Sequence, residues 1–287
     1  MAVQMHVAHS RIVKGAGVIA GGPYYCAQGS AFTAYYNCMA PGYFTPLPAT
    51  GLLKTETESS AAAGRIDPPA SLAGSRAWLF TGTRDRTVAS GVVEALDGYY
   101  RAFKVRTVVV HDKPAGHAMV TADFGNRCDA TAAPYLNDCD YDAAGEMLRF
   151  LLGPLAPPAA ASGGRLVRFD QARYAGGDAR ALSLADEAFV YVPKSCEGGH
   201  CRVHIAFHGC RQNADAVGEA FVRHAGYNRW ADANRLIVLY PQTLARYFPV
   251  FNPRGCWDWW GYTGADYATR NGAQIRAVTA MVRRLAD

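Results

Sequence analysis

Short runs of strand-forming residues alternate with helix-length segments along most of the chain. The apolar runs lie at residues 15–20, 77–81, 106–110, 166–169, 187–192, 202–207 and 236–240. The main helix-length segments lie at residues 89–103, 143–152, 215–234 and 264–285. Strands that alternate with helices are typical of a sheet whose crossovers are helical. The sequence therefore predicts an α/β fold, with a mostly parallel sheet and helices on both of its faces.

The length of 287 residues fits one large domain or two small ones. We expect a single catalytic domain over 1–287, with an irregular insertion at about 24–73 and a candidate internal linker at 153–164. A composition of 50% apolar and 18% charged residues argues against disorder. No apolar run approaches the ~20 residues that span a bilayer. The net charge of +5 is spread along the chain without a basic block, so neither a membrane nor nucleic acid is expected as a partner.

The chain contains eight cysteines but no C-x2-C doublet of the kind that zinc ribbons use, so no metal is expected. We expect four disulfides, although eight cysteines allow 105 pairings. Disulfides indicate an extracellular or periplasmic protein, with free thiols in the cytosol as the alternative. The start MAVQMHVAHSR is no signal peptide, so one is expected upstream. The expected pairs are Cys26–Cys38, Cys128–Cys139, Cys196–Cys201 and Cys210–Cys256.

Two polar residues follow neighbouring predicted strands. Asp85 lies in a GTRD turn after AWLFT, and His117 lies in KPAGHAM after RTVVV. In α/β-hydrolases the catalytic acid and then the histidine occupy such loops, and the acid holds the imidazole that acts as general base. Taken singly, Asp85 could be an ordinary turn residue and His117 a surface histidine. Their order and spacing predict a catalytic pair.

The segment VHIAFHGCRQ at 203–212 runs from a buried strand into His208, Gly209 and Cys210. It is similar to the His-Gly loop of α/β-hydrolases, in which a backbone N–H helps to form the oxyanion hole. We expect Cys210 to supply that N–H and the Cys210–Cys256 disulfide to hold the loop rigid. The alternative is a plain strand-to-helix turn.

The segment NPRGCWDWWGY at 252–262 contains three tryptophans within four residues. Tryptophan is seldom buried completely, so the cluster fits an aromatic rim for an apolar polyester or an aromatic ester. A packed structural corner is the alternative. Trp257 and Trp259 are the candidate substrate contacts.

The acid and the histidine precede the oxyanion strand here, whereas an ordinary α/β-hydrolase has them after it. This order predicts a circularly permuted α/β-hydrolase. The motifs GAGVIAGGPYYC, FTGTRDRTV, KPAGHAMVT, FHGCRQ, YPQ and NPRGCWDWWGY together resemble the circularly permuted (type 2) poly(3-hydroxybutyrate) depolymerases and related esterases. The resemblance implies cleavage of short-chain polyhydroxyalkanoate esters by a Ser-His-Asp triad, without metal or cofactor. It makes Asp85 the triad acid, His117 the base, Cys210 the oxyanion residue, and Trp257 or Trp259 a substrate contact.

The nucleophile departs from the family pattern. Relatives carry a box similar to Gly-x-Ser-x-Gly-Gly-Tyr-Met, and Met1 matches its last residue, so the serine falls about five positions before this chain. No Gly-x-Ser-x-Gly occurs within it. We therefore expect an N-terminally truncated, inactive form of a monomeric esterase that acts on a polyester or small ester. The alternatives are a non-catalytic relative that binds a polymer or other ligand, and a feruloyl- or acetyl-esterase of the same fold.

Overall fold

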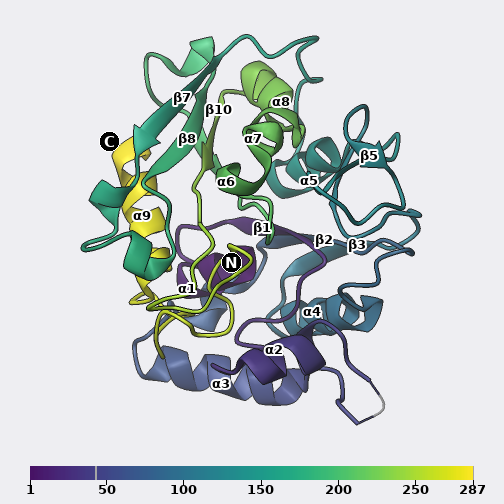
Figure 1. Ribbon diagram of the computed structural model, residues 1–287, viewed down its shortest axis with the longest axis vertical. Coiled ribbons are helices and arrows are strands. Elements are labelled where there is room, and N and C mark those ends of the chain that lie inside the picture. The colour runs from purple at the N-terminus through teal and green to yellow at the C-terminus, as the bar shows by residue number, and fades with distance from the viewer. Residues whose placement is uncertain (43, 287) are drawn as a thin grey trace. The chain divides into compact units, whose positions relative to one another are not determined.

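The structure is a computed structural model and describes residues 1–42 and 44–286 (Figure 1). It contains two compact units, each built from several chain segments. Unit 1 comprises Met1–Met119, Arg127–Thr131 and Asp258–Ile275, and unit 2 comprises Val120–Asn126, Ala132–Trp257 and Arg276–Asp287. The candidate linker at 153–164 lies wholly inside unit 2. The single catalytic domain stays a prediction.

Unit 1 is built on a parallel sheet whose three strands lie in chain order. β1 (Gly15–Ile19), β2 (Arg76–Phe80) and β3 (Arg106–Val110) occupy the three predicted positions. β2 pairs with both neighbours in parallel, and its last four residues are buried. α4 (Ser90–Ala102) is the crossover between β2 and β3 and contacts both strands (Figure 1). It buries an apolar stripe at helical spacing: Val92, Val93, Leu96, Tyr99 and Tyr100.

The other helices of unit 1 surround this sheet or belong to the predicted insertion. α1 (Ala2–Ala8) packs against β1. The insertion contains α2 (Ala31–Cys38), α3 (Thr50–Ala62) and the 3₁₀ turn η1 (Pro69–Leu72). Ser30 caps α2 by accepting a hydrogen bond from the Thr33 N–H, which satisfies one of the orphan donors at a helix start. α3 packs on α4, so the insertion adds a helical layer to this unit.

Unit 2 contains a four-stranded sheet in the order β7-β8-β10-β9. β10 (Leu236–Tyr240) is entirely buried and pairs in parallel with β9 (Arg202–Ile205). β8 (Glu187–Val192) is antiparallel to β10 and to β7 (Arg165–Asp170). The link from β7 to β8 contains only two 3₁₀ turns, η2 (Ala172–Tyr174) and η3 (Arg180–Leu182). No α-helix crosses from β7 to β8, as is usual between parallel strands, and this edge of the sheet is antiparallel. A further turn, η4 (Lys194–Cys196), follows β8.

The prediction of one continuous helix over 215–234 is wrong. The structure has three short helices instead, α6 (Ala214–Val217), α7 (Ala220–His224) and α8 (Tyr227–Asn234). The chain breaks before α8 at Gly226, whose φ of +92° is incompatible with a right-handed helix and suits glycine. α8 packs against β10, β8 and α5 (Ala143–Leu152), and its buried residues include Trp230 and Ala231 (Figure 1).

Two further helices and a small sheet complete the secondary structure of the described residues. α5 (Ala143–Leu152) has the predicted bounds and is capped by Asp142, which accepts a hydrogen bond from the Gly145 N–H. α9 (Ala273–Ala286) begins nine residues later than the predicted 264, because the preceding segment forms a loop. The sequence analysis missed a small sheet in the order β4-β6-β5, whose strands have only two or three residues: β4 (Met119–Thr121), β5 (Asn126–Arg127) and β6 (Leu136–Asp138).

Three of the predicted disulfides are confirmed directly by their geometry. The Cα–Cα distances are 6.1 Å for Cys26–Cys38, 5.8 Å for Cys196–Cys201 and 4.2 Å for Cys210–Cys256. Cys128 and Cys139 are also disulfide-bonded, and no free cysteine occurs within residues 1–42 and 44–286. The free-thiol alternative is therefore not the state of this structure.

Candidate functional site

The two loops that follow β2 and β3 bring an acid and a histidine together within unit 1. His117 Nδ1 lies 2.9 Å from Asp85 Oδ2, which is the expected hydrogen bond. The Asp85 side chain is only 2% exposed, whereas the His117 side chain is 32% exposed. His117 Nε2 has no hydrogen-bond partner among the residues that the structure describes. The imidazole is thus held at one nitrogen, and its other nitrogen is available to a reacting group.

The second oxygen of the Asp85 carboxylate is also occupied. Asp85 Oδ1 accepts hydrogen bonds from the N–H groups of Thr87 (2.8 Å) and Val88 (3.0 Å). Two backbone donors on one oxygen fix the plane of the carboxylate, because the backbone around them is itself ordered. The other oxygen, Oδ2, is therefore held in an orientation that faces His117 Nδ1.

The position of His117 depends on close backbone packing around its loop. The His117 N–H donates to Thr131 Oγ1 at 3.0 Å, and the Gly116 N–H donates to the Cys128 carbonyl at 2.8 Å. A Cβ at Gly116 would lie 2.2 Å from the Ala130 carbonyl oxygen, a distance that no side chain tolerates. Glycine is required here so that the histidine loop can approach the segment at 127–131.

The predicted oxyanion residue, Cys210, lies on an exposed loop of unit 2 after β9. The hydrogen bonds of this loop are nearly complete. The Gly209 N–H donates to Gln212 Oε1, the Gln212 N–H to the Gly209 carbonyl, and the Arg211 N–H to the Arg254 carbonyl. The Cys210 N–H has no acceptor among the described residues. An exposed backbone donor without a protein partner is what an oxyanion site requires.

The two candidate tryptophans have different surroundings. Trp257, in unit 2, is 4% exposed and packs edge-to-face on Phe207 at 5.0 Å. Its indole N–H has no hydrogen-bond partner among the described residues. Trp259, in unit 1, is partly buried and meets Trp260 edge-to-face at 5.5 Å. The packed-corner alternative thus describes the burial of Trp257, while Trp259 keeps an accessible surface.

Sequence analysis missed the residue that organises the tryptophan loop. Asp258 is 1% exposed and accepts hydrogen bonds from the N–H groups of Gly261, Tyr262 and Thr263, and from the Thr263 hydroxyl. Burial raises the pKa of this carboxyl, and these donors act against the rise. Asp258 is followed three residues later by Gly261, a turn pattern that could have indicated the role.

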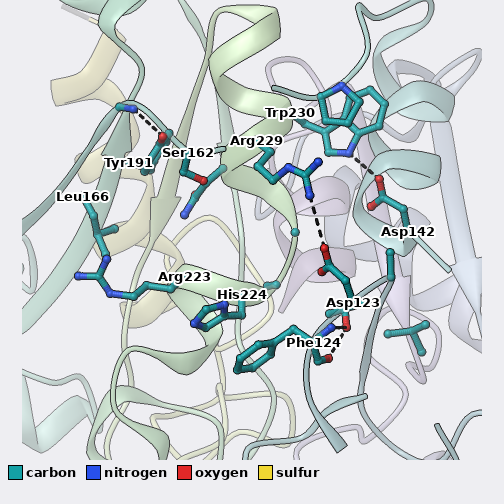
Figure 2. Close-up of a pocket in the computed structure, with 18 residues that line it drawn as sticks. Asp123, Phe124, Asp142, Ser162, Leu166, Tyr191, Arg223, His224, Arg229 and Trp230 are labelled. Carbon is teal, nitrogen blue, oxygen red and sulfur yellow. Dashed lines mark hydrogen bonds and ion pairs between the residues drawn. The ribbon is translucent and has the colours of Figure 1, made fainter. Parts of the chain in front are cut away.

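A separate cavity of about 530 Å³ lies within unit 2, between α7, α8 and the segment at 120–124 (Figure 2). Its charged groups are largely compensated. Arg229 lies 3.5 Å from Asp123, and Trp230 Nε1 donates to Asp142 at 2.7 Å. His224 stacks on Phe124 with ring centroids 3.7 Å apart. None of the predicted site residues lines this cavity, and we assign it no part in the chemistry below.

The predicted site residues divide between the units. Asp85, His117 and Trp259 belong to unit 1, and Cys210 and Trp257 belong to unit 2. Within the described part of the chain, no three His, Cys, Asp or Glu side chains are grouped so that they could hold a metal ion. No helix among the described residues is both long and apolar enough to cross a membrane.

An acid–histidine pair on the loops after neighbouring parallel strands is the arrangement of the α/β-hydrolase class. Comparison with known proteins agrees. A poly(3-hydroxybutyrate) depolymerase of Delftia acidovorans is 43% identical over 295 residues, which cover all of this chain but 57% of that protein. A polyhydroxybutyrate depolymerase of Talaromyces funiculosus is 33% identical over 303 residues, covering 99% of this chain and 86% of that one. No family model matches the sequence.

Solved structures give the same result. A PHB depolymerase with a serine-to-alanine substitution, complexed with an R3HB trimer, superposes with a TM-score of 0.88 at 31% identity, covering 100% of this chain and 92% of that one. The PHB depolymerase from Penicillium funiculosum gives 0.87 at 30% identity, covering 99% and 91%. The fold is therefore of the α/β-hydrolase type, and the chain belongs to the polyhydroxybutyrate depolymerase family. It spans little more than half of the Delftia relative.

Proposed function

We propose that this chain is the larger part of a secreted polyester hydrolase that cleaves 3-hydroxybutyrate-type esters by a Ser-His-Asp mechanism. The observation that carries the proposal is the 2.9 Å hydrogen bond between Asp85 and His117, with the second imidazole nitrogen available. Membership of the depolymerase family supports the reaction class. The circular permutation is part of the proposal, because the acid and the histidine precede the oxyanion strand in the chain.

The proposed chemistry assigns one task to each group. His117 Nε2 accepts the proton of a serine hydroxyl as its oxygen attacks the ester carbonyl, and Asp85 stabilises the imidazolium that forms. The Cys210 N–H donates to the oxyanion of the tetrahedral intermediate. His117 then protonates the departing alkoxide. The alcohol leaves, and the acyl group remains on the serine as an ester. Water hydrolyses that ester after His117 takes its proton, and the serine is regenerated.

The nucleophilic serine is proposed to lie upstream of Met1, since no Gly-x-Ser-x-Gly occurs within the chain. We expect the 287-residue chain to be nearly inert on p-nitrophenyl butyrate. A form extended upstream through its own in-frame Gly-x-Ser-x-Gly should hydrolyse it, and His117→Asn should abolish that activity. Loss of a triad member leaves only ~10³–10⁴-fold catalysis over water.

The same experiment separates the alternatives. A stop codon directly upstream would favour a non-catalytic relative that binds a polymer. Full activity of the short chain, abolished by changing an internal serine such as Ser30, would refute our placement of the nucleophile. Faster hydrolysis of feruloyl or acetyl esters than of 3-hydroxybutyrate oligomers would favour the other esterase specificity.

A stretch of the chain without charged side chains supports a neutral polymer as the substrate. Residues 15–53 contain no Asp, Glu, Lys, Arg or His. Several large apolar side chains of this stretch are nevertheless exposed, including Phe32 at 64% and Phe44 at 90%. The rings of Phe32 and Tyr36 lie 4.5 Å apart, so they form a contiguous patch on α2. Exposed apolar patches mark interaction sites, and an aliphatic polyester has no charge to match.

This surface gives the substrate proposal its own test. We expect Phe32→Ser combined with Phe44→Ser to reduce binding of the 287-residue chain to polyhydroxybutyrate granules at least fivefold. In the extended enzyme, hydrolysis of soluble p-nitrophenyl butyrate should change by less than twofold, because neither side chain belongs to the catalytic pair. Exposed Ile12, changed to Ser, is the matched control outside the patch. Unchanged granule binding in the double variant would contradict the polymer proposal.

The proposal also covers the localisation, the oligomeric state and the cofactor requirement of the enzyme. Eight disulfide-bonded cysteines support export to an oxidising compartment, extracellular or periplasmic. The signal peptide is proposed to lie upstream with the serine. A single catalytic domain acting as a monomer, without metal or cofactor, completes the proposal. Size-exclusion chromatography with light scattering tests the monomer, and unchanged activity in EDTA tests the absence of a metal.

A further inference from the structure

A buried histidine beside the candidate oxyanion residue joins two segments of unit 2. His208 is 3% exposed, and its ring lies between the loop at 208–212 and the chain after β10. His208 Nδ1 lies 2.7 Å from the Gly209 carbonyl oxygen. On the other side of the ring, the Thr243 N–H donates to His208 Nε2 at 3.1 Å. One imidazole therefore bridges two backbone groups.

The partners of His208 define its tautomer. A backbone N–H can only donate, so the Thr243 amide requires an unprotonated Nε2. The Thr243 hydroxyl oxygen also lies 3.3 Å from Nε2, but its proton goes to the Gly255 carbonyl at 2.6 Å, and the backbone N–H makes the shorter contact with Nε2. A neutral imidazole then carries its proton on Nδ1, which donates it to the Gly209 carbonyl. Burial lowers the pKa of His208 to about 4, so the ring is neutral at neutral pH.

This hydrogen bond determines the direction of the next N–H. In a trans peptide the carbonyl and the following N–H point in opposite directions. Because the Gly209 carbonyl is turned toward the His208 ring, the Cys210 N–H points away from it. The Gln212 N–H also donates to the Gly209 carbonyl, at 3.2 Å, and holds the peptide plane from a second side. The Cys210 N–H is left facing outward without an acceptor among the described residues.

Two neighbours keep the ring of His208 in place. Trp257 packs against it with ring centroids 5.6 Å apart. The Cys210–Cys256 disulfide ties the far side of the loop to the segment that contains Trp257. The disulfide fixes where Cys210 lies, but it does not set the rotation of the peptide between Gly209 and Cys210. Only groups bonded to that peptide can do so.

We propose that His208 is a positioning residue that aims the Cys210 N–H at the oxyanion through its hydrogen bond to the Gly209 carbonyl. It touches no substrate, takes no proton in the reaction, and works as a neutral donor. The inference rests on the proposed function, since it gives the oxyanion role of Cys210 its structural cause. Its geometric part can be tested without any activity.

The first experiment measures the tautomer by nitrogen-15 NMR of the 287-residue chain. We expect His208 Nδ1 to be protonated and Nε2 unprotonated, with no change between pH 8 and pH 5.5. A proton on Nε2, or a titration of this ring near pH 6.5, would overturn the proposal whatever the enzyme does. This readout is independent of where the nucleophilic serine lies.

The second experiment uses the upstream-extended enzyme and two substitutions. His208→Leu fills similar space but cannot donate to Gly209, whereas the Nδ2 of His208→Asn occupies the place of imidazole Nδ1 and can. We expect His208→Leu to lower kcat 10- to 100-fold with KM changed less than threefold, since losing a whole oxyanion donor costs ~10²–10³-fold. His208→Asn should recover most of kcat, although it leaves the Thr243 N–H unpaired. His111→Leu, at an exposed histidine, is the matched control.

These variants distinguish a role of His208 in orienting the Cys210 N–H from a role in packing alone. If His208 served only packing, both substitutions would lower the melting temperature and kcat together, or neither would change kcat. Loss of kcat in His208→Asn equal to that in His208→Leu would refute the proposal, as would an unchanged kcat in His208→Leu. An extended enzyme that is inactive, or that keeps full activity in His117→Asn, would instead refute the proposed function.

Discussion

Replacement of Asp85 by asparagine tests the proposed catalytic pair, Asp85 and His117, with little change in the shape of the side chain. Asp85 Oδ1 accepts two backbone N–H groups, and Oδ2 faces His117 Nδ1. An asparagine has one acceptor oxygen and one NH₂ group in place of these two oxygens. The oxygen must face the backbone donors, since an NH₂ group there would oppose the N–H groups of Thr87 and Val88. The asparagine NH₂ is thereby directed at His117.

This orientation reverses the histidine tautomer. With the asparagine NH₂ donating to Nδ1, the neutral His117 ring carries its proton on Nε2, where it cannot accept one from a serine. In the serine protease that is the general model for this effect, the same change lowers kcat by ~10⁴. We expect a similar loss for Asp85→Asn in the upstream-extended enzyme. Folding should hardly change, because three hydrogen bonds remain, and the expected destabilisation is below about 1 kcal/mol.

Asp85→Ala is the matched comparison for stability. It leaves the two backbone donors and the His117 N–H without their acceptor in a site where the Asp85 side chain is 2% exposed. Each unpaired buried donor costs about 1–3 kcal/mol, and entry of water relieves part of this, so we expect a loss of about 2–4 kcal/mol. Urea unfolding of the 287-residue chain measures both variants. Equal unfolding free energies for Asn and Ala, or more than a tenth of the parent kcat in Asp85→Asn, would refute the reasoning.

Two further predictions concern stability. The unfolding free energy should fall as the pH drops from about 6.5 toward 4, because burial lowers the pKa of His6 to about 4 while the unfolded chain protonates near 6.5. The contribution of neutral His6 to the unfolding free energy is fully present above pH 6.5. Between pH 6.5 and 4, His6→Gln should reduce the slope of the unfolding free energy against pH by up to ~1.4 kcal/mol per pH unit. Urea unfolding measures this slope, and an unchanged slope in the variant would contradict the prediction. Removing the disulfide Cys210–Cys256, which closes a 46-residue separation, should cost about 4 kcal/mol by loop entropy, against about 2 for Cys196–Cys201 with its separation of 5. Melting of the paired Ala variants checks this, and a larger loss for the short loop would contradict it.

The strands were predictable because the residues in each strand themselves favour extended backbone. RTVVV and LIVLY are short runs rich in β-branched or aromatic residues, and both form strands with the expected bounds. The antiparallel edge of β7 and β8 was not predictable from the same signal. Its direction depends on what the link between the strands contains, and the sequence of that link has the length of a helix but forms only 3₁₀ turns.

The acid–histidine pair was predictable for a reason of topology. Loops after neighbouring parallel strands emerge at the same edge of a sheet, so residues 32 positions apart can meet there. No sequence pattern of this kind predicted the hydrogen-bond partners of His208 or Asp258. His208 bonds to Thr243, 35 residues away, and Gln4 donates to the Asp258 carbonyl across 254 residues. Such contacts depend on how distant loops pack, which no local pattern encodes.

The uncharged stretch at 15–53 contains both buried and exposed aromatic side chains. Tyr24 and Phe32 are aromatic residues eight positions apart, yet Tyr24 is 1% exposed and Phe32 is 64% exposed. The buried Tyr24 hydroxyl donates to the Ala268 carbonyl, 244 residues away in the chain. Phe32 is exposed on α2, where its ring lies 4.5 Å from that of Tyr36 in the same helix. The lack of charge in this segment does not distinguish its buried from its exposed aromatic side chains, because burial depends on contacts with distant residues such as Ala268.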